Sequence, residues 1–403
     1  MTSTADTLRF ATAGSVDDGK STLVGRLLHD SKSVLTDQLE AVARASRDRG
    51  QEAPDLALLT DGLRAEREQG ITIDVAYRYF ATPRRRFILA DTPGHVQYTR
   101  NMVTGASTAD LAVVLVDARH GVVEQTRRHA AVAALLRVPH IVLAVNKMDL
   151  VDWSEKEFSR ITDDFAHHAH DLGAALPRFT AIPLSALDGD NVVLPSPRMD
   201  WYEGPTLLDH LETVPTGDDL TDRPARFPVQ YVIRHGEERH YAGRLESGTL
   251  RVGDPVVVLP TGRTSTVAAL DRLGEPVTEA YASDSLTLRT TEQLDIARGD
   301  LLAHVATAPP LTRDVTADAC HLHDRPLRIG DRVLLKHTTR TVKAIVTDLP
   351  GAPDGLTAND LGRLHLRTAE PLALDPYAVS RRTGSFLLID PADGATLTAG
   401  MAR

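Results

Sequence analysis

Cysteine is almost absent from this chain of 403 residues, which contains only Cys320. A single thiol excludes a disulfide within the chain and a zinc site built from cysteines alone. Long apolar runs are missing too: residues 111–116 and 141–145, among the longest, are far shorter than the roughly 20 residues of a membrane-spanning helix. Residues 1–7 lack the basic and apolar segments of a secretory signal. These absences predict a soluble cytoplasmic protein with no membrane contact.

The sequence also has no excess of positive charge. Lysine and arginine number 45 against 55 aspartates and glutamates, and the net charge is -10. This balance argues against a protein that holds nucleic acid mainly through bulk charge and leaves a local basic patch open. We expect no nucleic-acid partner. Hydrophobic residues make up 42%, which excludes a disordered chain, and the length suggests two or three domains.

The first half of the chain alternates short apolar runs with helix-length segments. Strands that are apolar on both faces are typical of a buried parallel sheet, and the alternation predicts a doubly wound, mostly parallel α/β fold. The expected strands are residues 8–13, 87–90, 111–116, 141–145 and 179–183. The expected helices are residues 21–31, 98–104, 123–136, 154–172 and 206–213.

The polar stretch 215–224, rich in Pro, Gly and Asp, predicts a linker. Beyond it the segments are short, strand-like and separated by Gly, Pro and Asp, which is typical of β-barrels. A break at Pro309 and Pro310 divides this region into two. We therefore expect an α/β plus all-β fold. The expected domains are a phosphate-loop domain and two β-barrel domains, at residues 1–217, 218–308 and 309–403.

A glycine-rich loop, GSVDDGKS, follows the first expected strand and runs from Gly14 to Ser21. It fits the phosphate-loop pattern, in which glycines turn the backbone so that its N–H groups point at phosphate oxygens. The helix N-terminus behind the loop favours anions, Lys20 can reach the β- and γ-phosphates, and the Ser21 hydroxyl can bind Mg²⁺. A plain strand-to-helix turn is the alternative. The nucleotide contacts expected here are Gly14, Ser15, Val16, Asp17, Asp18, Gly19, Lys20, Ser21 and Thr22.

Two further segments are candidates to meet a γ-phosphate and a metal ion. Asp91 follows an apolar strand and can hold Mg²⁺ through water, and the N–H of Gly94 can touch the γ-phosphate. Thr72 can add a second hydroxyl ligand, so that its segment orders with triphosphate and relaxes with diphosphate. The expected metal ligands are thus Ser21, Thr72 and Asp91. The alternatives are a Thr-Pro-Gly turn after the strand and an edge strand over residues 71–76.

The base is expected to meet two later turns. Asp149 offers two acceptors to adjacent N–H donors of guanine, whereas adenine would leave the carboxylate unpaired at a cost on the order of several kcal/mol. Asn146 and the stem of Lys147 can fix this turn and cover the base. The turn after the next strand can offer a backbone N–H to guanine O6, at Ser185, Ala186 and Leu187. Each turn alone is a common polar turn, but the order of all the segments predicts binding of GTP and Mg²⁺.

These motifs resemble those of translational GTPases of the elongation factor Tu/1-alpha type, in which a GTP-binding domain precedes two β-barrels. That resemblance covers essentially the whole chain. A narrower resemblance is to the GTPase subunit of bacterial sulfate adenylyltransferase (ATP sulfurylase). The strings that carry it are GSVDDGKSTLVGRLLHDSK from Gly14, EREQGITIDVAYRYF from Glu66, ADTPGHVQYTRNMVTGAST from Ala90 and LLKHTTRTVKA from Leu334. Elongation factors that deliver aminoacyl-tRNA are the alternative. They usually have His where this chain has Ser15 and Asp18, and Thr where it has Ser21.

The resemblance implies a heterodimer. In it this chain hydrolyses GTP, and a separate catalytic small subunit of the ATP-pyrophosphatase type transfers the adenylyl group of ATP to sulfate. Adenosine 5′-phosphosulfate and pyrophosphate are the implied products, formed in sulfate assimilation. The resemblance gives His95 the role of orienting the attacking water, with Lys20 and Thr72 as further catalytic residues. The chain shows no second phosphate loop, so we expect no adenylylsulfate kinase activity.

Two other clusters carry weaker signals. Cys320, His321 and His323 could suggest a metal site, but with one thiol in a strand-rich region we predict a chance grouping. The run from Arg84 to Arg86 follows a proline, and we expect an exposed turn between strands rather than a phosphate or RNA site.

Overall fold

The structure is a computed structural model, and it describes residues 7–32, 36–48, 54, 56–59, 75–92, 99–172, 179–216, 220–236 and 238–403. The chain divides into two compact units, Met1–Gly217 and Asp218–Arg403. Within the described residues, no helix is long and apolar enough to cross a membrane.

A six-stranded sheet forms the centre of the first unit, in the order β2-β3-β1-β4-β5-β6. Every neighbouring pair is parallel except β2 with β3. All residues of β4 are buried, as expected for an apolar strand in the middle of a sheet covered on both faces. The strands are β1 (Thr7–Ala13), β2 (Ala76–Ala81), β3 (Arg86–Asp91), β4 (Leu111–Asp117), β5 (His140–Asn146) and β6 (Phe179–Pro183).

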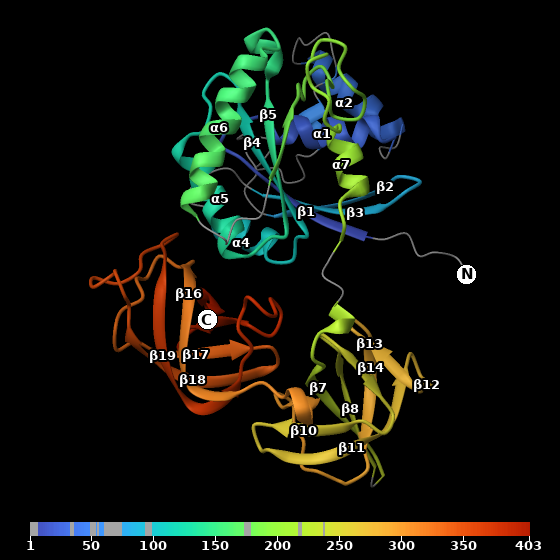
Figure 1. Ribbon diagram of the computed structural model, residues 1–403, viewed down its shortest axis with the longest axis vertical. Helices are drawn as coiled ribbons and strands as arrows, with labels where there is room; N and C mark the ends of the chain where they lie inside the picture. The colour runs from blue at the N-terminus through green and yellow to red at the C-terminus, as the bar shows by residue number, and fades with distance from the viewer. Residues whose placement is uncertain are drawn as a thin grey trace. The chain divides into compact units, whose positions relative to one another are not determined.

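Helices cover both faces of this sheet (Figure 1). Leucines of α1 and α7 are buried against one face of the strands, whereas α4, α5 and α6 contact β1, β4 and β5 from the other. This doubly wound arrangement confirms the predicted α/β class. The helices are α1 (Lys20–Asp30), α2 (Thr36–Asp48), α4 (Thr99–Ala106), α5 (Glu124–Leu135), α6 (Glu155–Asp171) and α7 (Leu207–Thr213). Short 3-10 turns are η1 (Leu56–Leu59) and η3 (Met148–Val151).

The sequence analysis predicts neither α2 nor β2. Strand β2 lies at the edge of the sheet, where Tyr77 and Tyr79 are exposed on one face. On the other face Phe80 is buried, and its ring stacks on that of Phe87 with 4.6 Å between centroids. The strand therefore depends on an aromatic partner from β3. The edge strand considered for residues 71–76 falls largely outside the described residues.

The prediction of an exposed turn between β2 and β3 is correct for Arg84 and wrong for Arg85. The Arg85 side chain is buried and donates hydrogen bonds to the carbonyl oxygens of Leu211 (2.9 Å) and Val214 (2.6 Å). These carbonyls belong to the end of α7, where a helix leaves acceptors without intrahelical partners and its dipole favours a cation. Arg85 thus ties the hairpin to the last helix of the unit.

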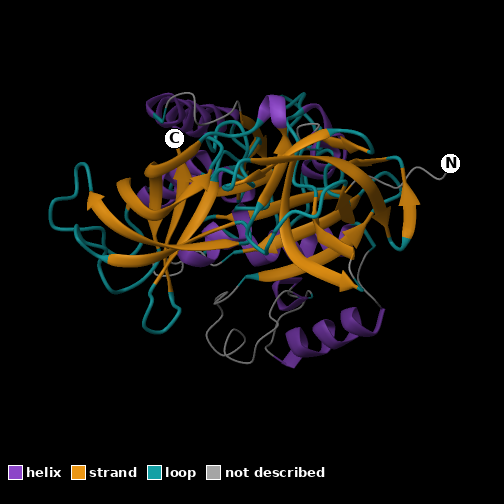
Figure 2. Ribbon diagram, turned by 90° about the horizontal axis from the view of Figure 1, so that it is seen from below, coloured by secondary structure: helices purple, strands orange, loops and turns teal. Residues whose placement is uncertain are grey.

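The second unit consists of two barrels built mainly of strands, which Figure 2 draws in orange. Its described helical segments are the short 3-10 turns η5 (Leu220–Asp222) and η6 (Val305–Thr307). In the first barrel the order is β10-β15-β7-β8-β14-β11-β12, and a further pairing of β10 with β11 closes the ring. A small two-stranded sheet, β9 with β13, completes it. Its strands are β7 (Arg226–His235), β8 (Glu238–Arg244), β9 (Thr249–Arg251), β10 (Pro255–Leu259), β11 (Arg263–Arg272), β12 (Glu275–Val277), β13 (Glu279–Tyr281), β14 (Ser285–Thr290) and β15 (Leu301–His304).

The second barrel is closed in the order β16-β19-β18-β17-β20-β21. Each barrel encloses its own apolar core. Between the barrels, Arg226 donates two hydrogen bonds of 2.9 Å to the carboxylate of Asp375, and both side chains are buried. The α/β plus two-barrel class is therefore confirmed. The strands are β16 (Leu311–His321), β17 (Arg332–His337), β18 (Arg340–Asp348), β19 (Leu361–Ala373), β20 (Ser385–Ile389) and β21 (Thr396–Ala402).

Candidate nucleotide-binding site

The predicted phosphate loop connects β1 to α1, as the motif requires. Gly19 has a φ of +91°, a conformation that favours glycine, and a Cβ there would lie 2.5 Å from the amide nitrogen of Asn146. A Cβ on Gly14 would lie 3.0 Å from Cβ of Leu115 in β4. The two glycines therefore let the loop turn tightly against the ends of β4 and β5.

The ammonium group of Lys20 lies over the loop. Its Nζ donates to the carbonyl oxygens of Gly14 and Ser15, both at 2.7 Å, and the side chain is 8% exposed. Burial lowers the pKa of Lys20, and the nearby carboxylates of Asp18 and Asp91 oppose that shift. The hydroxyl of Ser15 is buried and has no hydrogen-bond partner among the described residues. A buried cation and an unpaired hydroxyl in a glycine cradle fit a phosphate group.

Asp18 contributes to the loop itself. Its side chain is buried and accepts a hydrogen bond of 2.5 Å from the N–H of Ser15, while burial raises the pKa of its carboxyl. Its carbonyl oxygen accepts a hydrogen bond of 2.7 Å from the Asn146 amide. The side chain of Asp18 is therefore committed within the loop, and its backbone N–H lies 3.4 Å from the carbonyl oxygen of Ser15.

The expected metal ligands fall partly within the described residues. Asp91 is the last residue of β3 and is 2% exposed, and Ser21 stands in the first turn of α1. Their oxygens are the kind of donor that Mg²⁺ prefers. The hydroxyl of Thr12, which faces Asp91 in the parallel register, donates to its carboxylate at 2.9 Å. Thr72, Gly94 and His95 lie outside the described residues.

Thr12 is absent from the sequence-based predictions. The only signal that could have indicated it is a hydroxyl within β1, because its pairing with Asp91 depends on the register of β1 and β3. Among the residues that the structure describes, no group of three or more His, Cys, Asp or Glu side chains is placed to hold a metal ion.

Asn146 connects the phosphate loop with the turn after β6. Its amide nitrogen donates to the carbonyl of Asp18, and its amide oxygen accepts a 2.9 Å hydrogen bond from the N–H of Ala186. The N–H of Ser185 donates to the carbonyl of Asp190 at 3.2 Å. Of the three residues predicted to meet guanine O6, two therefore use their N–H groups within the protein. Leu187, which is exposed, is the candidate that remains.

A residue of β4, Asp117, helps to hold the turn that contains Asp149. Lys147 has a φ of +65°, and its Nζ donates to the carbonyl oxygen of Asp17 and forms an ion pair of 2.8 Å with Asp117. Asp149 itself lies half-buried in η3. Sequence reasoning missed Asp117, although a carboxylate at the end of an apolar strand is the same signal that indicated Asp91.

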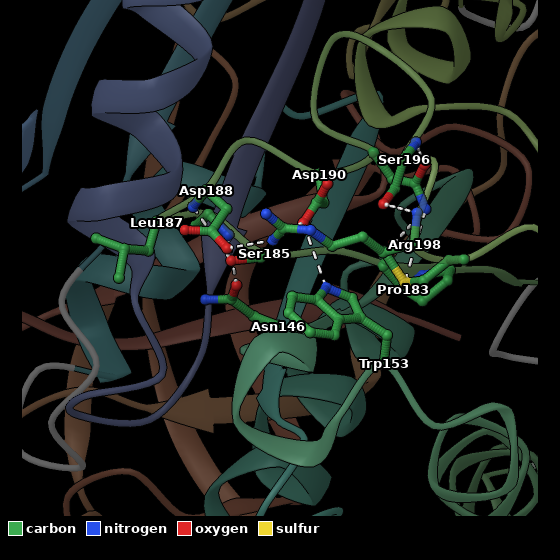
Figure 3. A network of polar contacts seen from close by, with 12 residues as sticks. Asn146, Trp153, Pro183, Ser185, Leu187, Asp188, Asp190, Ser196 and Arg198 are labelled. Atoms are coloured by element: carbon green, nitrogen blue, oxygen red, sulfur yellow. Dashed lines mark hydrogen bonds and ion pairs between the residues drawn. The ribbon is translucent and has the colours of Figure 1, made fainter.

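A network around Arg198 holds together the two turns that are predicted to meet the base (Figure 3). Its guanidinium bonds Asp188 at 2.7 Å and Asp190 at 3.4 Å, and its central carbon lies 4.6 Å from the ring centre of Trp153. The indole N–H of Trp153 also donates to Asp190 at 3.3 Å. Trp153 comes just after the turn that contains Asp149, whereas Asp188 and Asp190 come just after Leu187 in the other turn. The contacts of Arg198 therefore join the two turns. Nothing in the local sequence around Arg198 indicates this role.

Two protein families match the chain. Residues 5–217 match the family described as elongation factor Tu GTP binding domain, and residues 314–403 match the family described as GTP-eEF1A C-terminal domain-like. Among solved structures, the GTPase-like domain of S. cerevisiae Ski7, bound to GDP and inorganic phosphate, has a TM-score of 0.55. That likeness is 17% identical in sequence and covers 99% of this chain and 97% of the other, so it shows the fold alone.

Curated relatives share much more of the sequence. The bifunctional enzyme CysN/CysC of Mycobacterium tuberculosis is 54% identical over 98% of this chain, and the chain spans 67% of that relative. The bifunctional enzyme NodQ of Rhizobium sp. is 48% identical, and the chain spans 63% of it. Sulfate adenylyltransferase subunit 1 of Shewanella oneidensis is 48% identical over 98% of this chain and 84% of its own length. The chain therefore belongs to the sulfate adenylyltransferase subunit 1 family, whose N-terminal part is an elongation factor Tu GTP-binding domain.

Proposed function

We propose that this chain is the GTPase subunit of a heteromeric sulfate adenylyltransferase, and that it couples GTP hydrolysis to the formation of adenosine 5′-phosphosulfate and pyrophosphate from ATP and sulfate. The observation that carries GTP binding is the double link made by Asn146, which ties a phosphate loop to the turn after β6. The relatives named sulfate adenylyltransferase subunit 1 support the reaction. They favour this function over the alternative, delivery of aminoacyl-tRNA by a translation factor.

The proposed partner is a catalytic small subunit of the ATP-pyrophosphatase type. The words "subunit 1" in the names of the relatives support the existence of a partner. In the proposed complex the partner forms the phosphate–sulfate anhydride, and this chain supplies the energy by hydrolysing GTP. Formation of the anhydride is uphill, so hydrolysis of GTP must change the affinity between the two subunits; a ligand with equal affinity for both states would shift nothing. We place this complex in the cytoplasm.

Each phosphate-site residue has a proposed role. Lys20 exchanges its carbonyl acceptors for the β- and γ-phosphate oxygens, a stronger pairing for a buried cation. Ser21, Thr72 and Asp91 hold Mg²⁺, which when bound neutralises phosphate charge. Hydrolysis is in-line attack by water, and His95 orients that water.

Four base-side residues have roles of their own. Asp149 reads the two donors of the guanine edge, and Leu187 supplies an N–H to its O6. Asn146 ties the phosphate loop to the turn after β6, while the stem of Lys147 covers the ring. Val16 and Asp17 of the phosphate loop and Thr22 of α1 contribute backbone contacts. Together these roles predict selectivity for GTP over ATP.

The decisive experiment is to purify the chain with its small partner and measure sulfate-dependent pyrophosphate release with and without GTP. We expect GTP to accelerate the release, and GDP to fail to do so. His95→Ala should keep GTP affinity and lose partner-stimulated hydrolysis, whereas His167→Ala, on the exposed surface of α6, should behave as the parent. Equal pyrophosphate release with and without GTP would refute the proposed coupling, and co-purification of tRNA would favour the translation-factor alternative.

A further inference from the structure

Asp117, the last residue of β4, binds two cationic side chains, those of Arg119 and Lys147. Its carboxylate accepts hydrogen bonds from Arg119 through the backbone N–H (2.9 Å), Nε (3.0 Å) and Nη2 (2.6 Å), and pairs with Nζ of Lys147 at 2.8 Å. Its side chain is 3% exposed. These partners hold the pKa of Asp117 far below its usual range, against the effect of burial. Asp117 is therefore a buried anion with two cationic partners.

The position of Asp117 follows from the sheet. It faces Asn146 in the parallel register of β4 and β5, so it stands beside the residue that begins the base-recognising turn. Lys147, the next residue, has a left-handed backbone conformation that aims its side chain back across the sheet end. The Nζ of Lys147 thus meets Asp117 on one side and the carbonyl oxygen of Asp17 on the other.

The ion pair of Lys147 with Asp117 helps to connect the phosphate loop with the turn that contains Asp149. In the proposed site both segments contact the same nucleotide. The phosphate loop is held by Lys147 through Asp17 and by Asn146 through Asp18. A lysine side chain has many rotamers, which it loses when it is fixed, so a single carbonyl acceptor is a weak anchor for it. A buried carboxylate is a strong one, because charge-assisted hydrogen bonds are roughly twice as strong as neutral ones.

We propose that Asp117 is a positioning residue for nucleotide retention: it fixes Lys147 across the phosphate loop and so slows the release of bound guanine nucleotide. The inference rests on the proposed nucleotide site. Asp117 acts through Lys147, while Arg119 bonds both carboxylate oxygens of Asp117, one of which it shares with Lys147. Loss of Asp117 frees the lysine, which loosens the link between the two loops and shortens the lifetime of the complex.

The test measures release of fluorescently labelled GDP after a chase with excess GDP. We expect Asp117→Asn to accelerate release by tenfold or more, with association changed less than threefold, because the loop still forms but is no longer held. Glu212→Gln is the matched control: Glu212 is also a little-exposed carboxylate paired with an arginine, Arg84, but on α7. Its release rate should equal that of the parent. A parental release rate in Asp117→Asn would overturn the proposal.

A double-mutant cycle separates positioning from a general structural role. In a Lys147→Met background, Asp117→Asn should change the release rate less than twofold, because the residue through which it acts is gone. Equal acceleration in both backgrounds would overturn the proposal. If Asp117→Asn does not fold, the double variant Asp117→Asn/Arg119→Gln removes the unpaired guanidinium as well, and the same tenfold acceleration is expected there.

The failure of this inference is distinguishable from failure of the proposed function. A parent protein that binds no labelled GDP would refute the guanine-nucleotide site itself. A parent that binds GDP and releases it at the same rate as the Asp117 variants would leave that site intact and refute only the role of Asp117.

Discussion

His129, buried in α5, makes the stability of the first unit dependent on pH. Its side chain is 3% exposed, its Nε2 lies 2.9 Å from the amide nitrogen of Gln125, and its Nδ1 has no hydrogen-bond partner among the described residues. Burial, with smaller contributions from Lys20 and Arg128, lowers the pKa of His129 from 6.5 to about 3. The folded protein therefore keeps this ring neutral at pH values where an unfolded chain protonates it.

The sign and size of the effect follow from these two values. Because the folded pKa is the lower one, the unfolded state binds more protons as the pH falls below 6.5, and stability is lost down to about pH 3. Between pH 7 and pH 5 the loss from this one group is about 2 kcal/mol. His129→Gln removes the titrating ring and keeps a polar group beside Gln125. Between pH 7 and pH 5 the free energy of unfolding of the variant should therefore fall by about 2 kcal/mol less than that of the parent. This difference does not depend on the stability of the variant at pH 7.

The assay is urea unfolding of the full chain at pH 7, 6 and 5, followed by tryptophan fluorescence. Both tryptophans, Trp153 and Trp201, lie in the first unit, so their emission reports the unfolding of that unit. His167→Gln, at an exposed position on α6, should keep the parental pH dependence. Parallel stability curves for the parent and His129→Gln would show that His129 is not held neutral, and the reasoning would be refuted.

Three further predictions concern the base, the loop and the barrels. Asp149→Asn should lower GTP affinity by a hundredfold or more and improve xanthosine triphosphate binding, because the amide offers a donor to the extra carbonyl; unchanged selectivity in a competition assay would contradict the base contact. Gly19→Ala should weaken GDP binding at least tenfold by calorimetry, since its left-handed backbone costs alanine about 1–2 kcal/mol and its Cβ has no room; parental affinity would contradict the loop geometry. Arg226→Ala should destabilise the second unit by about 3–5 kcal/mol in calorimetric unfolding, because Asp375 would remain buried without its cation. Arg367→Ala, which breaks an exposed pair, should cost less than about 1 kcal/mol, and equal losses would contradict the argument from burial.

Strands and helices with strong local patterns were predictable. The apolar runs of β4 and β5 are buried along nearly their whole length, so their sequences alone indicate a central parallel sheet. β2 is different, because half of its side chains are exposed and the strand is stabilised by the stacking of Phe80 on Phe87. That contact joins two strands, and no local pattern contains it.

The residues around the candidate site also fall into two groups: those that a local sequence pattern predicts and those whose contacts depend on the fold. Glycines at positions 14 and 19 are required by the turn itself, and Lys20 by the charge of a phosphate, so a short string of residues is enough to predict them. The sequence predicts an exposed turn for Arg85 because the arginine run follows a proline, yet the side chain is buried against the end of α7. Its acceptors come from a helix that is distant in sequence.

The sequence by itself determined which residues can bind a phosphate and read a guanine, because those requirements are local: a loop conformation, a charge, a pair of acceptors. Only the tertiary structure decided how these residues are held. Asp117 faces Asn146, and Thr12 faces Asp91, because of strand registers that depend on the packing of the whole sheet. The supports of the site are therefore properties of the folded sheet, since each joins side chains that chain order keeps apart.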